Sequence, residues 1–288
     1  MRRVEVLLTR RRFVSVTTLG AAAVVDFAIA ALPVVIALRF RQEHASTEAR
    51  AAVAAFQVWW LGLGFTVFTN GAREAIAAFG WDATLAGAFN AWQFVYIIAT
   101  CASVAGLLYY LIFLFTGHSR WLRPLVGFYV IYAIVALALL ARLQPAGVAP
   151  GKWFVQWSYA NPGGLGAAVL GLMSLLLLLP QIVAAALYVL LRRRGIDPAA
   201  RRRVTIIGVA LLVWLGSTLI APFVQLGRFE AWQAGGRLVG LVASVAILRA
   251  YAESGDHAAR VLARDAEAGR GASAASHAAL LARARELI

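Results

Sequence analysis

The feature that most constrains this chain is a series of long apolar stretches. The two clearest, residues 164–191 and 204–224, contain no charged residue. Each is longer than the roughly 20 apolar residues that a helix needs to cross a ~30 Å hydrocarbon core. The segment between them, RRRGIDPAARRR (192–203), carries six arginines. We therefore interpret this segment as a loop between two membrane spans.

The composition agrees with an integral membrane protein. Hydrophobic residues make up 62% of the 288 residues, and charged residues only 14%. A soluble domain of this size would need more polar surface to cover its core. The net charge of +14 raises the question of nucleic-acid binding. The arginines lie instead at the ends of apolar segments, where such residues contact anionic headgroups. We expect the lipid bilayer as a partner and no nucleic acid.

Seven segments qualify as membrane helices. They predict an all-α integral membrane bundle of seven transmembrane helices with a short cytoplasmic amphipathic tail. The runs are too long and too uniformly apolar for barrel strands, so strands are not expected. Turn signals separate several runs, among them QPAGVAPG at 144–151. The predicted spans are 13–38, 52–72, 91–116, 124–141, 165–191, 204–225 and 232–250.

The predicted domains are a basic N-terminal segment (1–12), the seven-helix domain (13–250) and a cytoplasmic helical tail (251–288). The excess of arginine on cytoplasmic loops places residues 192–203 inside. Seven spans then put the N-terminus outside and the C-terminus inside, in a bacterial cytoplasmic membrane. The alternative topology keeps the N-terminus inside and makes 52–72 a re-entrant segment. TRRRFV (9–14) also resembles a twin-arginine export signal, which we interpret as a chance match.

The tail is too short for a catalytic domain. Residues 276–288 are expected to form a short helix that lies on the bilayer or pairs with a partner. Any signal is therefore expected to leave through a separate protein.

Several chemistries conflict with the residues present. The only lysine, Lys152, lies in a loop, which argues against a covalently bound retinal. Cys101 is the only cysteine, so no intramolecular disulfide can form. No HExxH or P-loop motif occurs. We expect no cofactor, no metal and no catalytic residues. The histidines, which all fall in predicted loops or the tail, are His44, His118, His257 and His277.

Charged residues within spans are costly, so each needs an explanation. Asp26 lies near the middle of the first span and Arg237 in the last, and we expect these two to pair. A structural ion pair is one interpretation, and one wall of a ligand site is the other. Further polar residues fall at the same membrane level. The candidate ligand-binding residues are Asp26, Arg73, Glu74, Asn90, Gln93, Gln225, Glu230, Gln233 and Arg237.

Three further patterns concern packing. Pro180 with Gln181 is expected to kink its helix. Gly236 and Gly240 form a GxxxG step that permits close helix contact. We expect Trp59, Trp60, Tyr109 and Tyr110 to pack in the core rather than to contact a cofactor.

The region from the third to the sixth span has a recognisable pattern. LLYYLIFLFTGHSRWLRPLVGFYVIYAIVALALL is followed by ALYVLLRRRGIDPAARRRVTIIGVALLVWLGSTLI. This pattern resembles the seven-helix sensor region at the N-terminus of some bacterial histidine kinases and diguanylate cyclases. The resemblance implies sensing of a membrane or extracytoplasmic cue. It covers about 120 residues and transfers no binding residue, and no kinase or cyclase module follows Tyr251.

These observations predict a sensor or receptor-like module that detects a small ligand and signals through a protein partner. One alternative is a structural or accessory subunit of a membrane complex. Another is a transporter or channel, although the spans show no inverted repeat. Homo-oligomerisation remains open.

Overall fold

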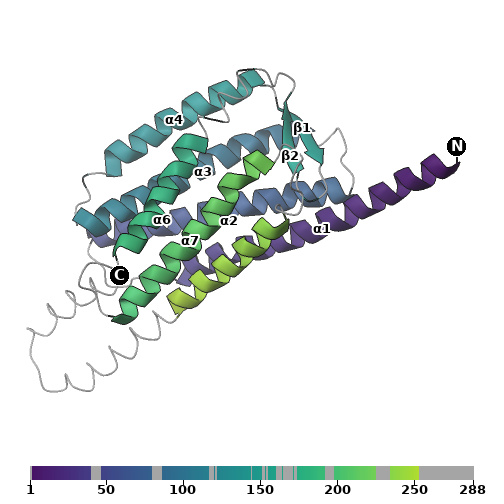
Figure 1. Ribbon diagram of the computed structural model, residues 1–288. Helices are drawn as coiled ribbons and strands as arrows, with labels where there is room; N and C mark the ends of the chain where they lie inside the picture. Colours follow the sequence, from purple (N-terminus) through teal and green to yellow (C-terminus); the bar gives the residue numbers. More distant parts are fainter. Residues whose placement is uncertain are drawn as a thin grey trace, which may run out of the picture.

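The computed structural model is a bundle of long helices with one small hairpin (Figure 1). One further helix, unlabelled and yellow-green in Figure 1, runs from Ala234 to Ala252 and is called helix 234–252 below. The labelled elements are α1 (Arg2–Arg39), α2 (Thr47–Phe79), α3 (Ala86–Thr116), α4 (Leu122–Leu143), β1 (Pro145–Pro150), β2 (Val155–Tyr159), η3 (Ser174–Leu178), α6 (Leu179–Leu191) and α7 (Pro198–Val224). The structure describes residues 2–39, 47–79, 86–116, 120, 122–143, 145–150, 153, 155–159, 164, 171, 174–191, 198–224 and 234–252.

Within the described residues, five helices are long and apolar enough to cross a membrane. Such a set of helices indicates a multi-pass membrane protein. The five correspond to the first four predicted spans and the last one. The predicted fifth and sixth spans fall on α6 and α7, which are not among the five, so a total of seven stays a prediction. The five segments are Thr17–Leu38, Arg50–Phe79, Ala91–Phe113, Leu122–Arg142 and Ala234–Ala252.

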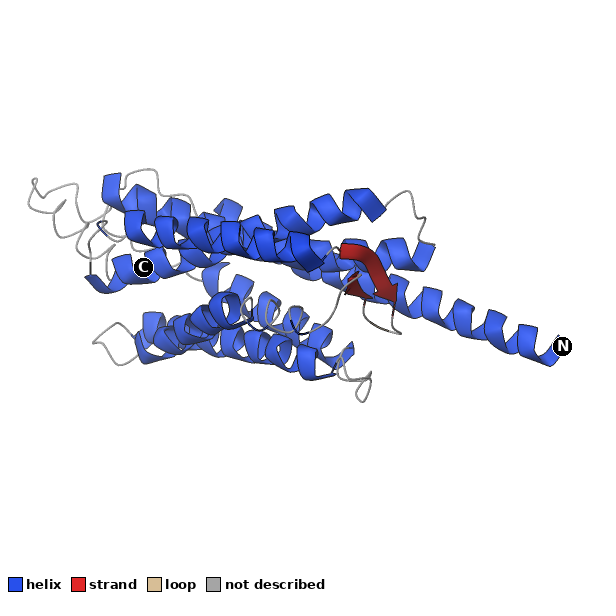
Figure 2. Cartoon of the chain, turned by 90° about the horizontal axis from the view of Figure 1, so that it is seen from above, coloured by secondary structure: helices blue, strands red, loops and turns tan. Residues whose placement is uncertain are grey.

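Successive helices run in opposite directions. Gln57 of α2 donates a hydrogen bond to the carbonyl oxygen of Ala37 in α1 at 3.0 Å. Farther along α2, Gly71 lies against Phe27 of α1. The contact therefore moves backward along α1 as it moves forward along α2. Figures 1 and 2 show the same side-by-side arrangement for the whole bundle, with the first part of α1 extending beyond it.

The bundle has two distinct ends. We call the end where α2 stops and helix 234–252 begins the hairpin end, because β1 and β2 lie there (Figure 1). At the opposite end, α2, α4 and α7 begin and helix 234–252 stops. We call it the arginine end, after the exposed side chains of Arg50, Arg123, Arg201, Arg202 and Arg249.

The α2–α3 interface is close because small residues face each other. A Cβ added at Gly106 of α3 would lie 2.5 Å from the carbonyl oxygen of Ala55 in α2. Ser103 of α3 donates a hydrogen bond to the carbonyl oxygen of Trp59 at 2.8 Å. Small residues and interhelical hydrogen bonds are the usual means of helix association in a membrane, where the lipid is as apolar as leucine.

An aromatic cluster fills the core between α2, α3 and helix 234–252. Phe56 contacts Tyr110 of α3 with ring centroids 4.6 Å apart, and Tyr251 of helix 234–252 at 5.7 Å. Trp59 and Trp60 are buried in the same cluster. The prediction that these tryptophans are core residues is therefore confirmed, and so is that for Tyr109 and Tyr110, which are also buried.

Of the two glycines in the GxxxG step of helix 234–252, only Gly240 lies in a close contact with described residues. A Cβ at Gly240 would lie 3.1 Å from Nε1 of Trp214 in α7, whereas one at Gly236 would meet no described atom within 4 Å. Gly240 therefore permits a close contact with α7.

The helix is irregular beside Pro180, where a kink was predicted. The π-helical turn η3 directly precedes α6, which contains Pro180 near its start. Gln181 donates a side-chain hydrogen bond to the carbonyl oxygen of Leu177 at 2.9 Å. Proline removes a backbone donor, and nearby side chains and local π geometry commonly satisfy the carbonyls that are left.

The expectation of no strands is wrong at one place. Residues 145–150, part of the predicted turn at 144–151, form β1, which pairs antiparallel with β2. Pro145 and Pro150 lie at the two ends of β1, where a missing backbone donor interrupts the ladder least. The Pro- and Gly-rich sequence of this segment is typical of a turn, but its two proline positions are also compatible with a strand of a short hairpin.

Two of the predicted domains, residues 1–12 and 251–288, fall only partly on residues that the structure describes. Residues 2–12 belong to the same helix as the first span, because α1 begins at Arg2. The tail beyond Ala252, including the predicted helix at 276–288, lies outside the described residues.

Candidate functional site

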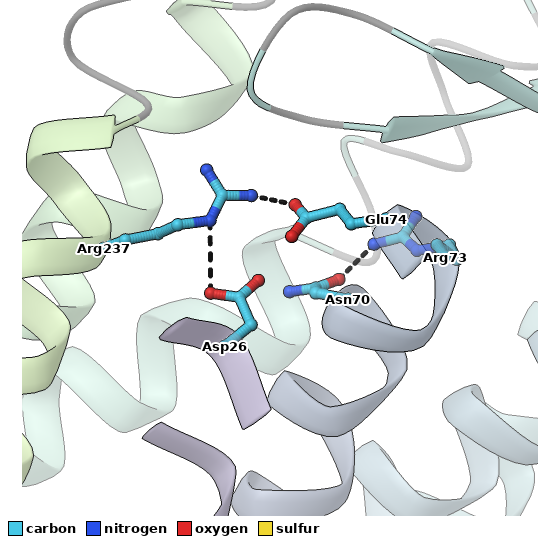
Figure 3. A network of polar contacts seen from close by, with 5 residues as sticks. All are labelled: Asp26, Asn70, Arg73, Glu74 and Arg237. Atoms are coloured by element: carbon cyan, nitrogen blue, oxygen red, sulfur yellow. Dashed lines mark hydrogen bonds and ion pairs between the residues drawn. The ribbon is translucent and has the colours of Figure 1, made fainter. Parts of the chain in front are cut away.

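The main polar feature of the bundle is an ion network centred on Arg237 (Figure 3). Nε of Arg237 lies 3.2 Å from Oδ1 of Asp26 in α1. Nη2 of the same guanidinium donates to Oε1 of Glu74 in α2. One cation from helix 234–252 therefore bridges carboxylates on two other helices.

A second pair extends the network along α2. Arg73 donates from Nη2 to Oδ1 of Asn70, one helical turn earlier (Figure 3). Together with Asp26, Glu74 and Arg237, this arginine gives the network two positive and two negative charges. The net charge of the network is therefore zero if all four groups are ionised. A charge buried in a low-dielectric interior needs such a partner of opposite sign.

Burial makes these interactions strong and costly to break. The side chain of Glu74 is 1% exposed, that of Asp26 7% and that of Arg237 11%. Taking an ion out of water costs several kcal/mol, roughly, and good pairing geometry is needed to recover this. The ion pairs of Arg237 with Asp26 and Glu74 thus hold helix 234–252 to α1 and α2. Lipid chains could not replace either partner, because they carry no charge.

The network lies toward the hairpin end of the bundle. At a rise of 1.5 Å per residue, Arg237 is about 5 Å along the helix axis from Ala234, and Asp26 about 14 Å from Thr17. Nearby, Val155 of β2 is buried against Leu19 of α1 and Ala78 of α2. The hairpin therefore packs on the same end of α2 that carries Glu74.

The predicted Asp26–Arg237 pair is confirmed. The structure also brings Arg73 and Glu74 into the network, as expected for residues at one membrane level. Gln93 is buried in α3. Asn90 lies in α3, but its side chain is outside the described part of the structure. Three further predicted residues, Gln225, Glu230 and Gln233, lie outside the described residues.

The bridge from Arg237 to Glu74 was missed. The predicted second span ended at residue 72 because Arg73 and Glu74 follow it. In the structure α2 continues to Phe79, and the apolar segment runs from Arg50 to Phe79. The apolar residues at 75–79 were the available signal that these two charges lie inside the span rather than at its end.

The described network consists of two carboxylates and two guanidinium groups, which form ion pairs and hydrogen bonds with one another and with Asn70. Oε2 of Glu74 is buried and has no hydrogen-bond partner among the described residues. In the same part of the chain, no three His, Cys, Asp or Glu side chains gather as they would around a metal ion.

Comparison with known proteins adds no assignment. The chain matches no protein-family model, no curated protein and no solved structure. The fold and the network must therefore carry the functional argument by themselves.

Proposed function

We propose that this chain is a sensor in a bacterial cytoplasmic membrane. It detects an extracytoplasmic or membrane-borne small ligand at the hairpin end and signals through a separate protein. The observation that carries the proposal is the single guanidinium of Arg237, which forms ion pairs with carboxylates on two other helices. Ionisable groups inside a membrane mark functional sites by default.

Helix 234–252 is a suitable element to carry a signal because it contacts α2 near both of its own ends. Arg237 bonds to Glu74 at the hairpin end, and Tyr251 contacts Phe56 and Trp60 near the arginine end. A ligand that competes with Arg237 for a carboxylate would weaken the first contact. The helix would then shift, and the tail that follows Tyr251 would move with it.

The orientation in this proposal follows from charge. The arginine end carries five exposed arginines of α2, α4, α7 and helix 234–252 and adjoins the six-arginine segment 192–203 in the sequence. The hairpin end has the exposed Arg142 of α4 and, beyond it, the five arginines in the first part of α1. Cytoplasmic loops are enriched in such residues, so the arginine end is inside and the hairpin end is outside. The ion network then lies in the outer part of the membrane, within reach of an external ligand.

The test is to capture the partner and to ask whether the network controls it. The full-length chain is purified from membranes in mild detergent, and its stable partner is identified by mass spectrometry. Arg237→Ala is expected to change the amount of partner bound by several-fold, whereas Arg249→Ala, an exposed position on the same helix, leaves it unchanged. A partner that binds equally to all three proteins contradicts the proposal.

An accessory-subunit role is the second candidate, and α4 favours it. Phe128, Ile131 and Ile134 of α4 are exposed large apolar residues, which lipid or another subunit could cover. Native mass measurement separates the two roles. A hetero-complex that persists at fixed stoichiometry with every network variant supports the subunit, and a partner released by Arg237→Ala supports the sensor.

A further inference from the structure

We propose that Asp26 and Glu74 together form a proton-binding site, and that a proton bound there releases Arg237 from its bridge. The inference rests on the proposed sensor function in one respect, because it names the proton as the stimulus.

The geometry places a proton in direct competition with Arg237. Both carboxylates pair with the same guanidinium: Oδ1 of Asp26 forms an ion pair with Nε, and Oε1 of Glu74 accepts a hydrogen bond from Nη2 (Figure 3). A proton on either carboxylate removes the negative charge that holds its half of the bridge. Because the two carboxylates share one arginine, they bind the proton as a coupled pair rather than as separate residues.

An open acceptor is available for the proton. Oε2 of Glu74 is buried and has no hydrogen-bond partner among the described residues. A proton on this oxygen neutralises the buried carboxylate and turns the oxygen into a hydroxyl donor, which removes the cost of burying a charge. It needs no cavity, which suits a side chain that is 1% exposed.

The described polar groups around the two carboxylates come from four helices. Asp26 comes from α1, Arg73 and Asn70 from α2, and Arg237 from helix 234–252. From α3, the phenol of Tyr96 lies within electrostatic reach of Arg73. With one proton on the pair, the positive charges of Arg73 and Arg237 face a single carboxylate. The excess positive charge then favours movement of Arg237 toward water at the hairpin end.

The experiment measures the distance between α1 and helix 234–252 at two pH values. Spin labels are placed at Val24→Cys and Leu238→Cys, two exposed positions, in a Cys101→Ala background. The full chain is reconstituted into vesicles that are equilibrated on both sides at mildly alkaline or mildly acidic pH. Acidification is expected to lengthen the mean label distance by a few ångström, roughly one side-chain length.

Neutral isosteres distinguish proton binding from a general effect of acid. Glu74→Gln at alkaline pH is expected to give the distance that the unsubstituted pair gives at acidic pH, with no further change on acidification. Asp26→Asn tests the other carboxylate in the same way. Asp197→Asn, at the sequence position before α7, keeps the full response and serves as the control.

Two results would overturn the inference. One is a distance that stays the same at both pH values, and the other is a full pH response that survives in both Glu74→Gln and Asp26→Asn. Either result leaves the sensor proposal standing if Arg237→Ala still changes partner binding. If partner binding ignores Arg237 while the distance follows pH, the sensor proposal fails and the proton site remains.

Discussion

Removal of the Arg237 guanidinium should destabilise the bundle more than any single substitution on its surface. Arg237→Ala leaves Asp26 and Glu74 buried at 7% and 1% side-chain exposure without the cation that they share. Breaking a buried ion pair by deleting one partner costs about 3–5 kcal/mol. At roughly 2–4 °C per kcal/mol for a chain of this size, the unfolding midpoint should fall by about 10 °C.

The only cysteine provides the assay. Cys101 is buried against α4 residues, so a thiol-reactive fluorogenic dye reports when the core opens during heating in mild detergent. Arg249→Ala is the matched control, because it removes the same charge from an exposed position on the same helix. Its effect should stay within about 0.5 kcal/mol.

A double-mutant cycle then isolates the bridge. Glu74→Gln and Arg237→Ala should be coupled by about 0.5–3 kcal/mol, since the second change no longer strands a charged Glu74. The reasoning is refuted if the two effects add, or if Arg237→Ala and Arg249→Ala lower the midpoint equally.

Three further outcomes follow from the packing. Gly106→Ala places a methyl group against the α2 backbone and should cost about 1–3 kcal/mol by the same dye assay, whereas Gly127→Ala on the open face of α4 should be neutral; equal effects would contradict the close α2–α3 contact. Tyr251→Ala removes two ring contacts and should cost about 1–3 kcal/mol, while Tyr251→Phe keeps most of the stability; a neutral Tyr251→Ala would place the ring outside the core. Ile131→Ser on α4 should hardly change partner binding if lipid covers that face, but should abolish it if a subunit does.

The membrane-spanning helices could be predicted because a helix must have about 20 apolar residues to cross a bilayer. The Asp26–Arg237 pair was predictable for a related reason. A charged side chain in contact with lipid has a high free energy. Two opposite charges in otherwise apolar helices lower that free energy by pairing with each other.

The rest depends on geometry that local sequence does not contain. The position of Glu74 opposite Arg237 depends on the continuation of α2 past its charged residues, where Ala78 packs with Leu19 of α1 and Val155 of the hairpin. The contact of Gly240 with Trp214, and the absence of one at Gly236, depends on which side of the helix faces α7. In the β1–β2 pairing, β1 (PAGVAP) has no strand pattern of its own, whereas β2 (VQWSY) alternates apolar and polar residues over a length too short to predict its partner.

The measurement that most directly tests the account is the side of the membrane on which each end of the bundle lies. Two variants, Gly195→Cys in the segment that precedes α7 in the sequence and Ala146→Cys in β1, are made separately in a Cys101→Ala background. Each is treated with a membrane-impermeant maleimide in intact cells. The account predicts labelling of Ala146→Cys in intact cells and of Gly195→Cys only after permeabilisation. The opposite pattern would put the ion network on the cytoplasmic side and contradict the proposal of an outward-facing sensor.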